Sequence, residues 1–489
     1  MIRIEMKKNL LVNTFIGLLL AGCSLTPELK KEVLDTPTNY ETLDGSHSLS
    51  VGITPSNRAL SNQWWEDFGD SNLNLLVEEA LRKNTDYAIA ASRVLQARAV
   101  LGMANADFFP TIGYNGNFAQ NQYSADSDPR GMGGGSVGAF SLSAVLSYEI
   151  DLWGRVRESS KAATASLLAI AANQETVRLS VISGVIDTYF LLLNLENQRK
   201  ILESTVKTYE ESYQYRLKQY QVGGIEEIVL QQSKVQLESA KANLYAIIRQ
   251  KSEVVSSLSI LLGRSAREIV AGEMRISQSL PSDVPVVPLA TPSTLISHRP
   301  DIKMAEENLL AANHSIGVAK ASYFPILSLS ALAGLSSSEM GKLFGATTGS
   351  VGLGVQGPIY DFGKTSNRVL EAEAKKEEAL INYRATIAKA FSEVKDALVA
   401  RENSEKRLNA IIAQAKSQER VYQIAKTRFE AGYTTHLELL DAERGWLSVQ
   451  LELSVAKADL LSSALSIYKA LGGGFEARRL EEKTMYERP

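Results

Sequence analysis

Residues 140–155 read Phe-Ser-Leu-Ser-Ala-Val-Leu-Ser-Tyr-Glu-Ile-Asp-Leu-Trp-Gly-Arg and join two kinds of secondary structure. From Phe140 to Ile150 apolar residues alternate with serine and glutamate, which is the two-residue period of a strand with one apolar face. After Gly154 no proline occurs before Pro281, so a helix can run on without a break. The stretch predicts a β-strand that leads directly into a very long helix.

This layout occurs twice in the chain. Residues 150–155 return as Ile359-Tyr360-Asp361-Phe362-Gly363-Lys364, and Tyr220-Gln221-Val222-Gly223 returns as Phe429-Glu430-Ala431-Gly432. Both pairs share one offset, because 359 − 150 and 432 − 223 both equal 209. Ala106-Asp107-Phe108-Phe109-Pro110 also returns, as Ala321-Ser322-Tyr323-Phe324-Pro325. A duplication of this length defines the architectural unit.

Three further segments have the alternating pattern. Apolar or glycine residues occupy every second position over 112–118, 327–333 and 351–355, and most residues between them are small or polar, such as Ser328 and Ser330. Strands of about ten residues with one apolar face and one small or polar face are typical of outer-membrane barrels. A soluble sandwich is the alternative, but four short strands of this kind would build a poor core. The pattern favours membrane strands, with external loops at Arg130–Gly138 and Ser336–Gly349.

Each pair of strands precedes a long interval without proline. The two intervals lie between Pro129 and Pro281 and between Pro358 and Pro489. They predict helices over about 155–220 and 364–430, each rising about 100 Å at 1.5 Å per residue. Helices of this length must pack against others to be stable in water.

A glycine then interrupts each helical pattern, at Gly223 and at Gly432, and a second helix runs back to about Leu262 and Leu471. Each copy therefore predicts a helical hairpin with a glycine at its tip. The expected organisation is a leader over 1–22, an extended arm over 23–62, a first repeat over 63–280, a Pro-rich connector over 281–300, a second repeat over 301–474 and a tail over 475–489.

The N-terminus resembles a bacterial lipoprotein signal. Lys7 and Lys8 precede a short apolar run, which ends in Leu20-Ala21-Gly22-Cys23. In such signals the cysteine carries acyl chains such as palmitate and becomes the first residue after cleavage. An ordinary signal peptide with an incidental cysteine is the alternative, but Cys23 is the only cysteine in the chain. We expect lipidation at Cys23, which anchors a protein without making it span the membrane.

Composition excludes several other classes. The net charge of −3 gives no basic surface for nucleic acid. No segment after the leader has 18 uninterrupted apolar residues, so no transmembrane helix is expected. The histidines lack metal-ligand spacing, and with one cysteine no zinc cluster or Cys–His pair emerges. We predict no enzyme, no metal and no cofactor.

Two glycine motifs are better explained structurally. Gly352-Leu353-Gly354-Val355-Gln356-Gly357 spells a dinucleotide fingerprint, but its glycines lie within a strand and Pro358 follows. Pro358–Thr365 nearly matches a phosphate loop, yet proline stands at its first glycine position. The repeated junction instead predicts that Asp151 and Asp361 cap the long helices and that Gly154 and Gly363 ease the bend from strand to helix.

Four strands cannot close a barrel. An open sheet edge inside lipid would leave backbone groups unpaired, so several chains must share the barrel. Two chains would supply eight strands, which barely leave a lumen, whereas twelve strands from three chains enclose water if the inner face is small and polar. The strands alone favour more than two chains.

The chain resembles the TolC/OprM family of bacterial outer-membrane efflux proteins, in its lipoprotein branch, over nearly all of residues 23–475. The resemblance rests on Trp64-Trp65-x-x-Phe68-x-Asp70, Ala80-Leu81-x-x-Asn84-x-Asp86, Phe109-Pro110, Tyr148-Glu149-Ile150-Asp151-Leu152-Trp153-Gly154, Arg299-Pro300-Asp301-Ile302 and Pro358-Ile359-Tyr360-Asp361. It implies a mixed α/β membrane protein, a homotrimer with a 12-stranded barrel in outer-membrane lipid and a periplasmic barrel of twelve helices. It also implies passive export of drugs and toxic compounds, with a periplasmic adaptor and an inner-membrane pump of the resistance-nodulation-division (RND) type as partners.

The resemblance assigns a gate to the second hairpin. Leu437, Asp441 and Arg444 match the family's aperture residues, and the first copy has Ile228, Gln232 and Val235 at the equivalent places, without charges. Asp441 and Arg444 share a helix face, so under three-fold symmetry they would link neighbouring chains while Leu437 adds an apolar ring. A solvated ion pair within one helix is the alternative.

Two other functions are alternatives to efflux. Type I protein secretion uses similar channels with an ATP-driven partner, but the lipoprotein signal and Trp64-Trp65 resemble the efflux branch. A structural coiled-coil lipoprotein would need heptads and no alternating strands, which Phe140–Ile150 contradicts.

Overall fold

The structure is a computed structural model that describes residues 25–29, 53–55, 60–124, 126, 134–277, 279–281, 283–289, 292–477 and 480. Cys23, the leader and part of the loop predicted at 130–138 lie outside the described residues. The chain divides into two compact units. The strand unit consists of Met1–Val33, Arg93–Ile170 and Met304–Arg384, and the tip unit of Leu34–Ser92, Ala171–Lys303 and Ala385–Pro489.

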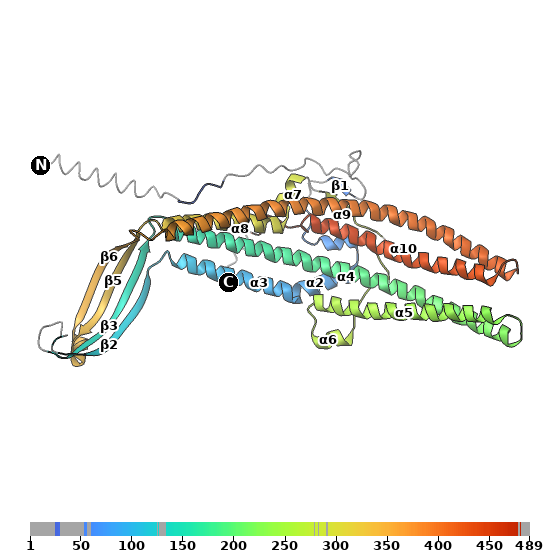
Figure 1. Cartoon of the computed structure of the whole chain (residues 1–489), viewed down its shortest axis with the longest axis horizontal. Coiled ribbons are helices and arrows are strands. Elements are labelled where there is room, and N and C mark those ends of the chain that lie inside the picture. Colours follow the sequence, from blue (N-terminus) through green and yellow to red (C-terminus); the bar gives the residue numbers. More distant parts are fainter. Residues whose placement is uncertain are drawn as a thin grey trace. The chain divides into compact units, whose positions relative to one another are not determined.

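The strand unit contains one antiparallel sheet of four long strands (Figure 1). They are β2 (Thr111–Tyr123), β3 (Gly135–Ile150), β5 (Ile326–Ser337) and β6 (Thr347–Gln356). Their order in the sheet is β2-β3-β5-β6, so the two repeats meet where β3 pairs with β5. Within the described residues β2 and β6 each pair on one side only, so both edges of this sheet remain open.

The register places most of the apolar residues of the four strands on one face. Directly opposed residues of an antiparallel pair share a face, and Leu146 lies opposite both Ile112 and Ala331, which in turn lies opposite Val351. On the other face Ser143 lies opposite Asn115 and Gly334. The alternation predicted for each strand therefore combines into one continuous apolar face and one mostly small or polar face.

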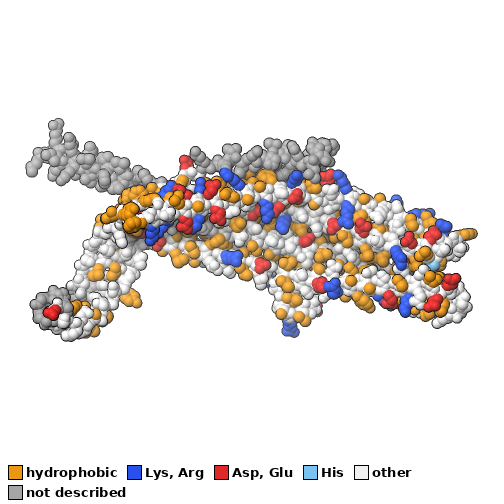
Figure 2. Space-filling model, in the orientation of Figure 1, with side chains coloured by type: hydrophobic (Ala, Val, Ile, Leu, Met, Phe, Trp, Pro, Cys, Tyr) orange, Lys and Arg blue, Asp and Glu red, His pale blue; other side chains and the backbone are white. Residues whose placement is uncertain are grey.

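The strands are almost free of charge. Glu149, near the end of β3, is the only Asp, Glu, Lys or Arg within the four strands. On the face shown in Figure 2, Lys, Arg, Asp and Glu side chains gather over the helices, whereas the strands present hydrophobic and uncharged groups. Several apolar strand residues are also highly exposed within this single chain, among them Tyr114, 90% exposed, and Val351, 79% exposed. This combination suits contact with lipid.

Each pair of strands lies between two helices. Helix α3 (Thr85–Ala106) precedes β2, and α4 (Arg155–Gln221) follows β3; α8 (Pro300–Ala321) precedes β5, and α9 (Lys364–Glu430) follows β6. The sequence predicted the two long helices over about 155–220 and 364–430. Both are 67 residues long. In the strand unit, Ile316 and Ala319 of α8 form a buried cluster with Val369 and Ala372 of α9.

The tip unit holds the two helical hairpins. The returning helices are α5 (Glu227–Leu261) and α10 (His436–Ala470), close to the limits that the sequence predicted. Smaller elements of the unit are η1 (Trp64–Phe68), α2 (Ser71–Lys83), α6 (Ala266–Ala271), α7 (Pro292–His298) and the parallel pair β1 (Ile53–Pro55) and β4 (Val287–Leu289).

An aromatic core packs η1 against helices of the two hairpins. Trp64 is fully buried and its ring stacks on Tyr468 of α10 at 4.9 Å, while Phe68 lies 5.3 Å from Phe190 of α4. The Tyr189 hydroxyl donates to Asp70, whose carboxylate also caps α2 by accepting from the backbone N–H of Asn72 and Leu73. Burial of aromatic surface is the main stabilising contribution here.

One helix bears on the expectation that the chain has no transmembrane helix. Among the described helices α4 contains an 18-residue window that is apolar enough by composition. The window is interrupted by polar residues, and its composition alone is weak evidence for a membrane span. Half of that window is buried within the chain, as in the core helix of a water-soluble domain. We therefore interpret this part of α4 as core.

Candidate junctions and periplasmic gate

The first junction between strand and helix is built around Asp151. Its carboxylate accepts hydrogen bonds from the backbone N–H of Val156, at 3.1 Å, and of Arg157, at 2.9 Å. Gly154 has φ +78°, a left-handed conformation that L side chains rarely adopt. Arg155 also holds Glu149 through two hydrogen bonds of 2.8 and 2.6 Å, which neutralises the one charge of the strands. Asp151 thus supplies acceptors for N–H groups that α4 leaves unpaired.

The second junction repeats this geometry around Asp361. Its carboxylate accepts from the backbone N–H of Gly363 and of Thr365, at 3.1 and 2.8 Å, and from the Thr365 hydroxyl, at 2.5 Å. The hydrogen bond from the Thr365 side chain, followed by the backbone bonds, lowers the pKa of the Asp361 carboxyl. Gly363 has φ +88°, like its counterpart. The acid therefore occupies the same structural position in both copies despite the shift of one place in sequence.

Aromatic side chains surround the junctions, and the sequence reasoning assigned them no role. The Trp153 ring stacks on Phe324 of the other repeat at 4.5 Å, and its indole N–H donates to the Pro325 carbonyl at 2.8 Å. Phe109 and Phe362 are 70% and 87% exposed. Exposed aromatic residues at strand ends are typical of a membrane–water interface. The recurrence of Phe-Pro and of Asp followed by Trp or Phe was the signal that could have identified them.

The hairpin tips in the tip unit are tight turns. Gly223 and Gly432 have φ +74° and +77° and lie just after the last residues of α4 and α9. At the second tip the Tyr433 N–H donates to the Arg428 carbonyl at 2.8 Å, and Thr435 caps α10. Each glycine thus ends a long helix in the left-handed conformation that such a turn requires.

The predicted gate residues lie on the first turns of α10, beside the second tip. Leu437 is 60% exposed, and Asp441 and Arg444 are exposed too. Although they share a helix face, Asp441 and Arg444 form no ion pair with each other, and no hydrogen bond or ion pair joins either to any other described residue. The intrahelical pair of the alternative interpretation is therefore absent, and both charges are open to a partner. At the equivalent first-copy positions, Ile228 and Val235 are exposed and apolar.

A cross-hairpin contact holds the two tips together. His436 of α10 accepts or donates a hydrogen bond of 3.2 Å with Ser233 of α5, and the Arg216 guanidinium of α4 lies 4.9 Å from the Phe429 ring of α9. Burial, followed by repulsion from Arg216, lowers the pKa of His436 to about 4. The imidazole is therefore neutral near pH 7. This contact was not predicted, because sequence spacing does not reveal which helix faces meet.

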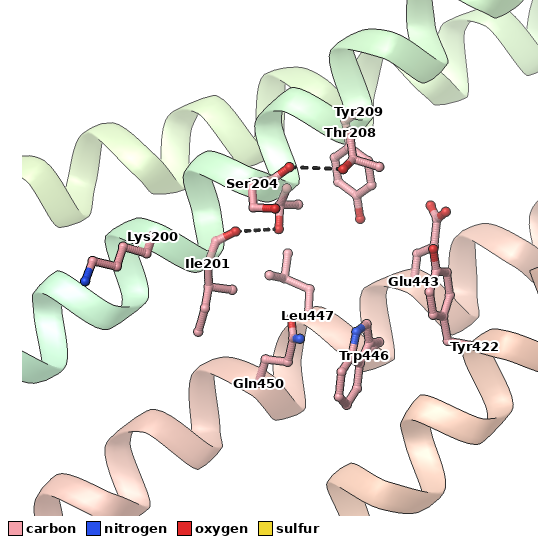
Figure 3. Close-up of a pocket in the computed structure, with 11 residues that line it drawn as sticks. Lys200, Ile201, Ser204, Thr208, Tyr209, Tyr422, Glu443, Trp446, Leu447 and Gln450 are labelled. Atoms are coloured by element: carbon pink, nitrogen blue, oxygen red, sulfur yellow. Dashed lines mark hydrogen bonds between the residues drawn. The ribbon is translucent and has the colours of Figure 1, made fainter. Parts of the chain in front are cut away.

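A groove of 410 Å³ runs along the same helices and is lined by residues of α4, α9 and α10 (Figure 3). Lys200, Tyr209, Tyr422, Glu443 and Trp446 contribute to it. Burial raises the pKa of the Glu443 carboxyl, opposed by Lys426 and Arg216. Figure 3 shows the Glu443 carboxylate beside the Tyr422 ring. No hydrogen bond or ion pair joins Glu443 to any described residue, so its charge is poorly compensated.

Membrane-type strands that lead in sequence into two long helical hairpins with glycine tips are typical of a channel protein of the outer membrane. The chain belongs to the outer membrane efflux protein family, whose sequence profile matches residues 76–264 and 291–473. The family places the chain in the outer membrane, with its helices in the periplasm, as a component of an efflux system. The predicted fold class, function and location are confirmed.

Individual relatives match along almost the whole chain. The probable efflux pump outer membrane protein TtgC of Pseudomonas putida is 30% identical over 472 residues, 96% of each chain. The cation efflux system protein CusC of Escherichia coli O6:H1 is 29% identical over 467 residues, 94% of this chain and 98% of the relative. The CmeC outer membrane channel of Campylobacter jejuni superposes with a TM-score of 0.87 at 28% identity, covering 95% of this chain and 98% of CmeC.

Proposed function

We propose that three copies of the chain form the passive exit channel of a tripartite efflux pump. Three four-stranded sheets would close a 12-stranded barrel, because 3 × 4 = 12, and the hairpins would continue it as a periplasmic tunnel of twelve helices, four from each chain. The partners would be a periplasmic adaptor and an inner-membrane RND pump, which supplies the energy and selects the compounds.

The open edges of the sheet carry this proposal. β2 and β6 each have one unpaired edge, and an unpaired backbone group costs several kcal/mol in hydrocarbon. Pairing β6 of one chain with β2 of the next removes both edges at every contact. The face with Ser143, Gly352 and Gly354 would line the lumen, and the face with Leu146, Val351 and Leu353 would contact lipid.

The tips of the second hairpins would form the gate. Asp441 and Arg444 are exposed and make no ion pair in the described part of the chain, so each can pair with its opposite on a neighbouring copy. Leu437, 60% exposed, would contribute an apolar ring at the same constriction. The first hairpin, with Gln232 in place of the acid, would support the gate without forming it.

The proposed anchor is an acyl group on Cys23, outside the described residues, which would hold the N-terminus in outer-membrane lipid. The compounds exported are drugs and other toxic substances. Among the relatives the names include toluene and antibiotic efflux pumps in Pseudomonas putida and a cation efflux system in Escherichia coli, so the class of compound differs between members.

Two measurements on the purified full chain test the assembly. Its mass in detergent should correspond to three copies, and it should form conducting pores in planar bilayers. A monomer without conductance would contradict the proposal. In cells, deletion should increase drug sensitivity; loss of a secreted protein from the medium, with drug sensitivity unchanged, would favour type I secretion instead.

A double variant tests the gate. Removing both charges with Asp441→Ala and Arg444→Ala should weaken each contact by about 0.2–1 kcal/mol and raise ion conductance several-fold when three contacts are lost. The matched control is Arg249→Ala with Glu253→Ala, which removes an exposed pair of 2.8 Å on α5. Equal conductance of the gate variant and the native channel would remove the gate assignment.

A further inference from the structure

A short segment just beyond the N-terminal cysteine is held against the helices of the strand unit. The Thr26 hydroxyl donates to the Glu158 carboxylate of α4 at 2.6 Å, and the Pro27 carbonyl accepts from the Asn313 side-chain amide of α8 at 2.9 Å. His314, the next residue of α8, lies 2.6 Å from the same Glu158 oxygen through its Nδ1. Two helices from different repeats thus converge on two consecutive residues.

The side chains that receive the segment are deeply buried. Glu158 is 3% exposed and Asn313 4% exposed. Burial by itself would raise the pKa of the Glu158 carboxyl, but hydrogen bonds from Thr26, Lys161 and His314 outweigh it and lower the pKa to about 2. Glu158 is therefore a buried carboxylate that depends on these donors, and Thr26 is one of them.

Gly317 makes room for the segment. A Cβ added at this glycine would lie 2.1 Å from the Thr26 hydroxyl oxygen and 3.1 Å from Cγ of Glu158. Real Cβ atoms essentially never come within 3.0 Å of another heavy atom, so an alanine here would displace Thr26. Pro27 adds rigidity, because its fixed φ reduces the entropy lost when the segment is ordered.

The equivalent positions of the other two helices, α3 and α9, do not form such a site. With the offset of 209, Glu158 corresponds to Asn367, and with the offset of 215 (321 − 106), His314 corresponds to Ala99 and Gly317 to Gly102. A Cβ added at Gly102 would meet nothing within 4 Å. Glu158 of α4 and His314 of α8 come from different copies, and their counterparts in α9 and α3 are an asparagine and an alanine, so only the α4 and α8 pair carries both the acid and the histidine.

We propose that Glu158, Asn313, His314 and Gly317 form a docking site for Thr26–Pro27 that fixes the N-terminal anchor at the junction between the strands and α4. Two residues separate Cys23 from Thr26, so the three steps from Cα to Cα span at most about 11 Å. Glu158 lies in the first turn of α4, close to the end of β3. An acyl group on Cys23 would thereby be held at the level where the strands end. This role rests on the proposed anchor, whereas the docking itself does not.

A designed disulfide tests the docking. A Cβ added at Gly317 would lie 3.3 Å from the Cβ of Thr26, so Thr26→Cys with Gly317→Cys places two Cβ atoms near the separation that a disulfide requires. The full-length double variant, purified from the cell envelope, should contain the 26–317 linked peptide in non-reducing mass spectrometry. The control is Thr26→Cys with Ser315→Cys, because Ser315 is exposed and points about 200° around α8 from Gly317. Absence of the 26–317 link, or equal linking in the control, would overturn the docking.

Single substitutions test its energetic basis without a new covalent bond. Thr26→Val keeps the shape of the side chain and removes one hydrogen bond to a charged group, and it lies outside the helices. In this variant the backbone amides of residues 26 and 28–29 should exchange with deuterium about tenfold faster than in the native chain. In the Gly317→Ala variant the same amides should exchange faster still. Ser315→Ala should exchange as the native chain does. Unchanged exchange in both Thr26→Val and Gly317→Ala would overturn the proposal.

Acylation of Cys23, which the anchor requires, is measured separately in the same samples. Mass spectrometry of the N-terminal peptide reports whether Cys23 carries acyl groups. Docking without acylation would leave the site intact and refute the anchor, whereas acylation without docking would refute the site and leave the proposed anchor standing.

Discussion

Acidification should loosen the contact between the two hairpin tips through His436. The pKa of this histidine falls from 6.5 to about 4 in the folded chain, first because of burial and then because of Arg216. The unfolded chain binds more protons than the folded chain between these pH values. The stability that neutral His436 contributes to the tips is therefore fully present above about pH 6.5 and is lost as the pH falls toward 4. The difference in pKa corresponds to a loss of about 2 kcal/mol at pH 5, which partial solvent exposure of the ring reduces to roughly 1 kcal/mol.

Glu443 acts in the opposite direction. Burial raises its pKa above 4.5, so the folded chain binds more protons than the unfolded chain, and protonation stabilises the tips as the pH falls. The effect of acid on His436 is therefore clearest in Glu443→Gln, because of these two groups only His436 can still titrate. At neutral pH this variant should also be more stable than the native chain, because no buried charge remains to be compensated.

Hydrogen–deuterium exchange of the tip amides, corrected for intrinsic rates, measures these effects on the full chain in detergent. Between pH 7 and about 5 the opening equilibrium should rise roughly fivefold in Glu443→Gln. His436→Asn is the matched control, because asparagine can keep a hydrogen bond to Ser233 but does not titrate in this range. The same pH dependence with and without the histidine would refute the reasoning.

Three further substitutions test the fold. Trp64→Ala removes a fully buried ring that stacks on Tyr468, and denaturant titration should show a loss of about 3–5 kcal/mol in the free energy of unfolding. Arg299→Met leaves the Glu393 carboxylate without its 2.6 Å partner, so we expect the free energy of unfolding to fall by about 1–3 kcal/mol. Arg299→Lys should recover part of this loss. No change in either variant would contradict the role of the ion pair. Gly154→Ala forces an L side chain to φ +78° and should lower the free energy of unfolding by about 1–2 kcal/mol, measured by thermal unfolding; an unchanged melting temperature would show that the junction can relax.

The local elements could be predicted because each depends on a pattern within a few residues. The alternation over Phe140–Ile150 and the proline-free interval after Gly154 define β3 and α4, and the repeat supplies the same information a second time. The junctions were predictable for the same reason, since Asp151 and Gly154 act on the neighbouring turn. Composition alone is ambiguous for α4, because a core helix can be apolar over a long window without an unbroken run.

The gate could be predicted only in part from the sequence. Sequence spacing put Asp441 and Arg444 on one helix face, but it could not decide whether they pair with each other. The structure leaves them unpaired with each other, since no ion pair of 4 Å or less joins them. The family resemblance supplied their role, and residue spacing supplied only their position.

The sequence by itself determined the periods, the breaks and the duplication, because strand alternation, helix ends and glycine turns are local consequences of side-chain chemistry and backbone sterics. Only the tertiary structure decided that Trp153 meets Pro325, 172 residues away, that Ser233 meets His436, 203 residues away, and that Thr26 fills the space at Gly317. Such contacts depend on how distant helices and strands pack, and packing is set jointly by many side chains, so no single stretch of sequence contains it.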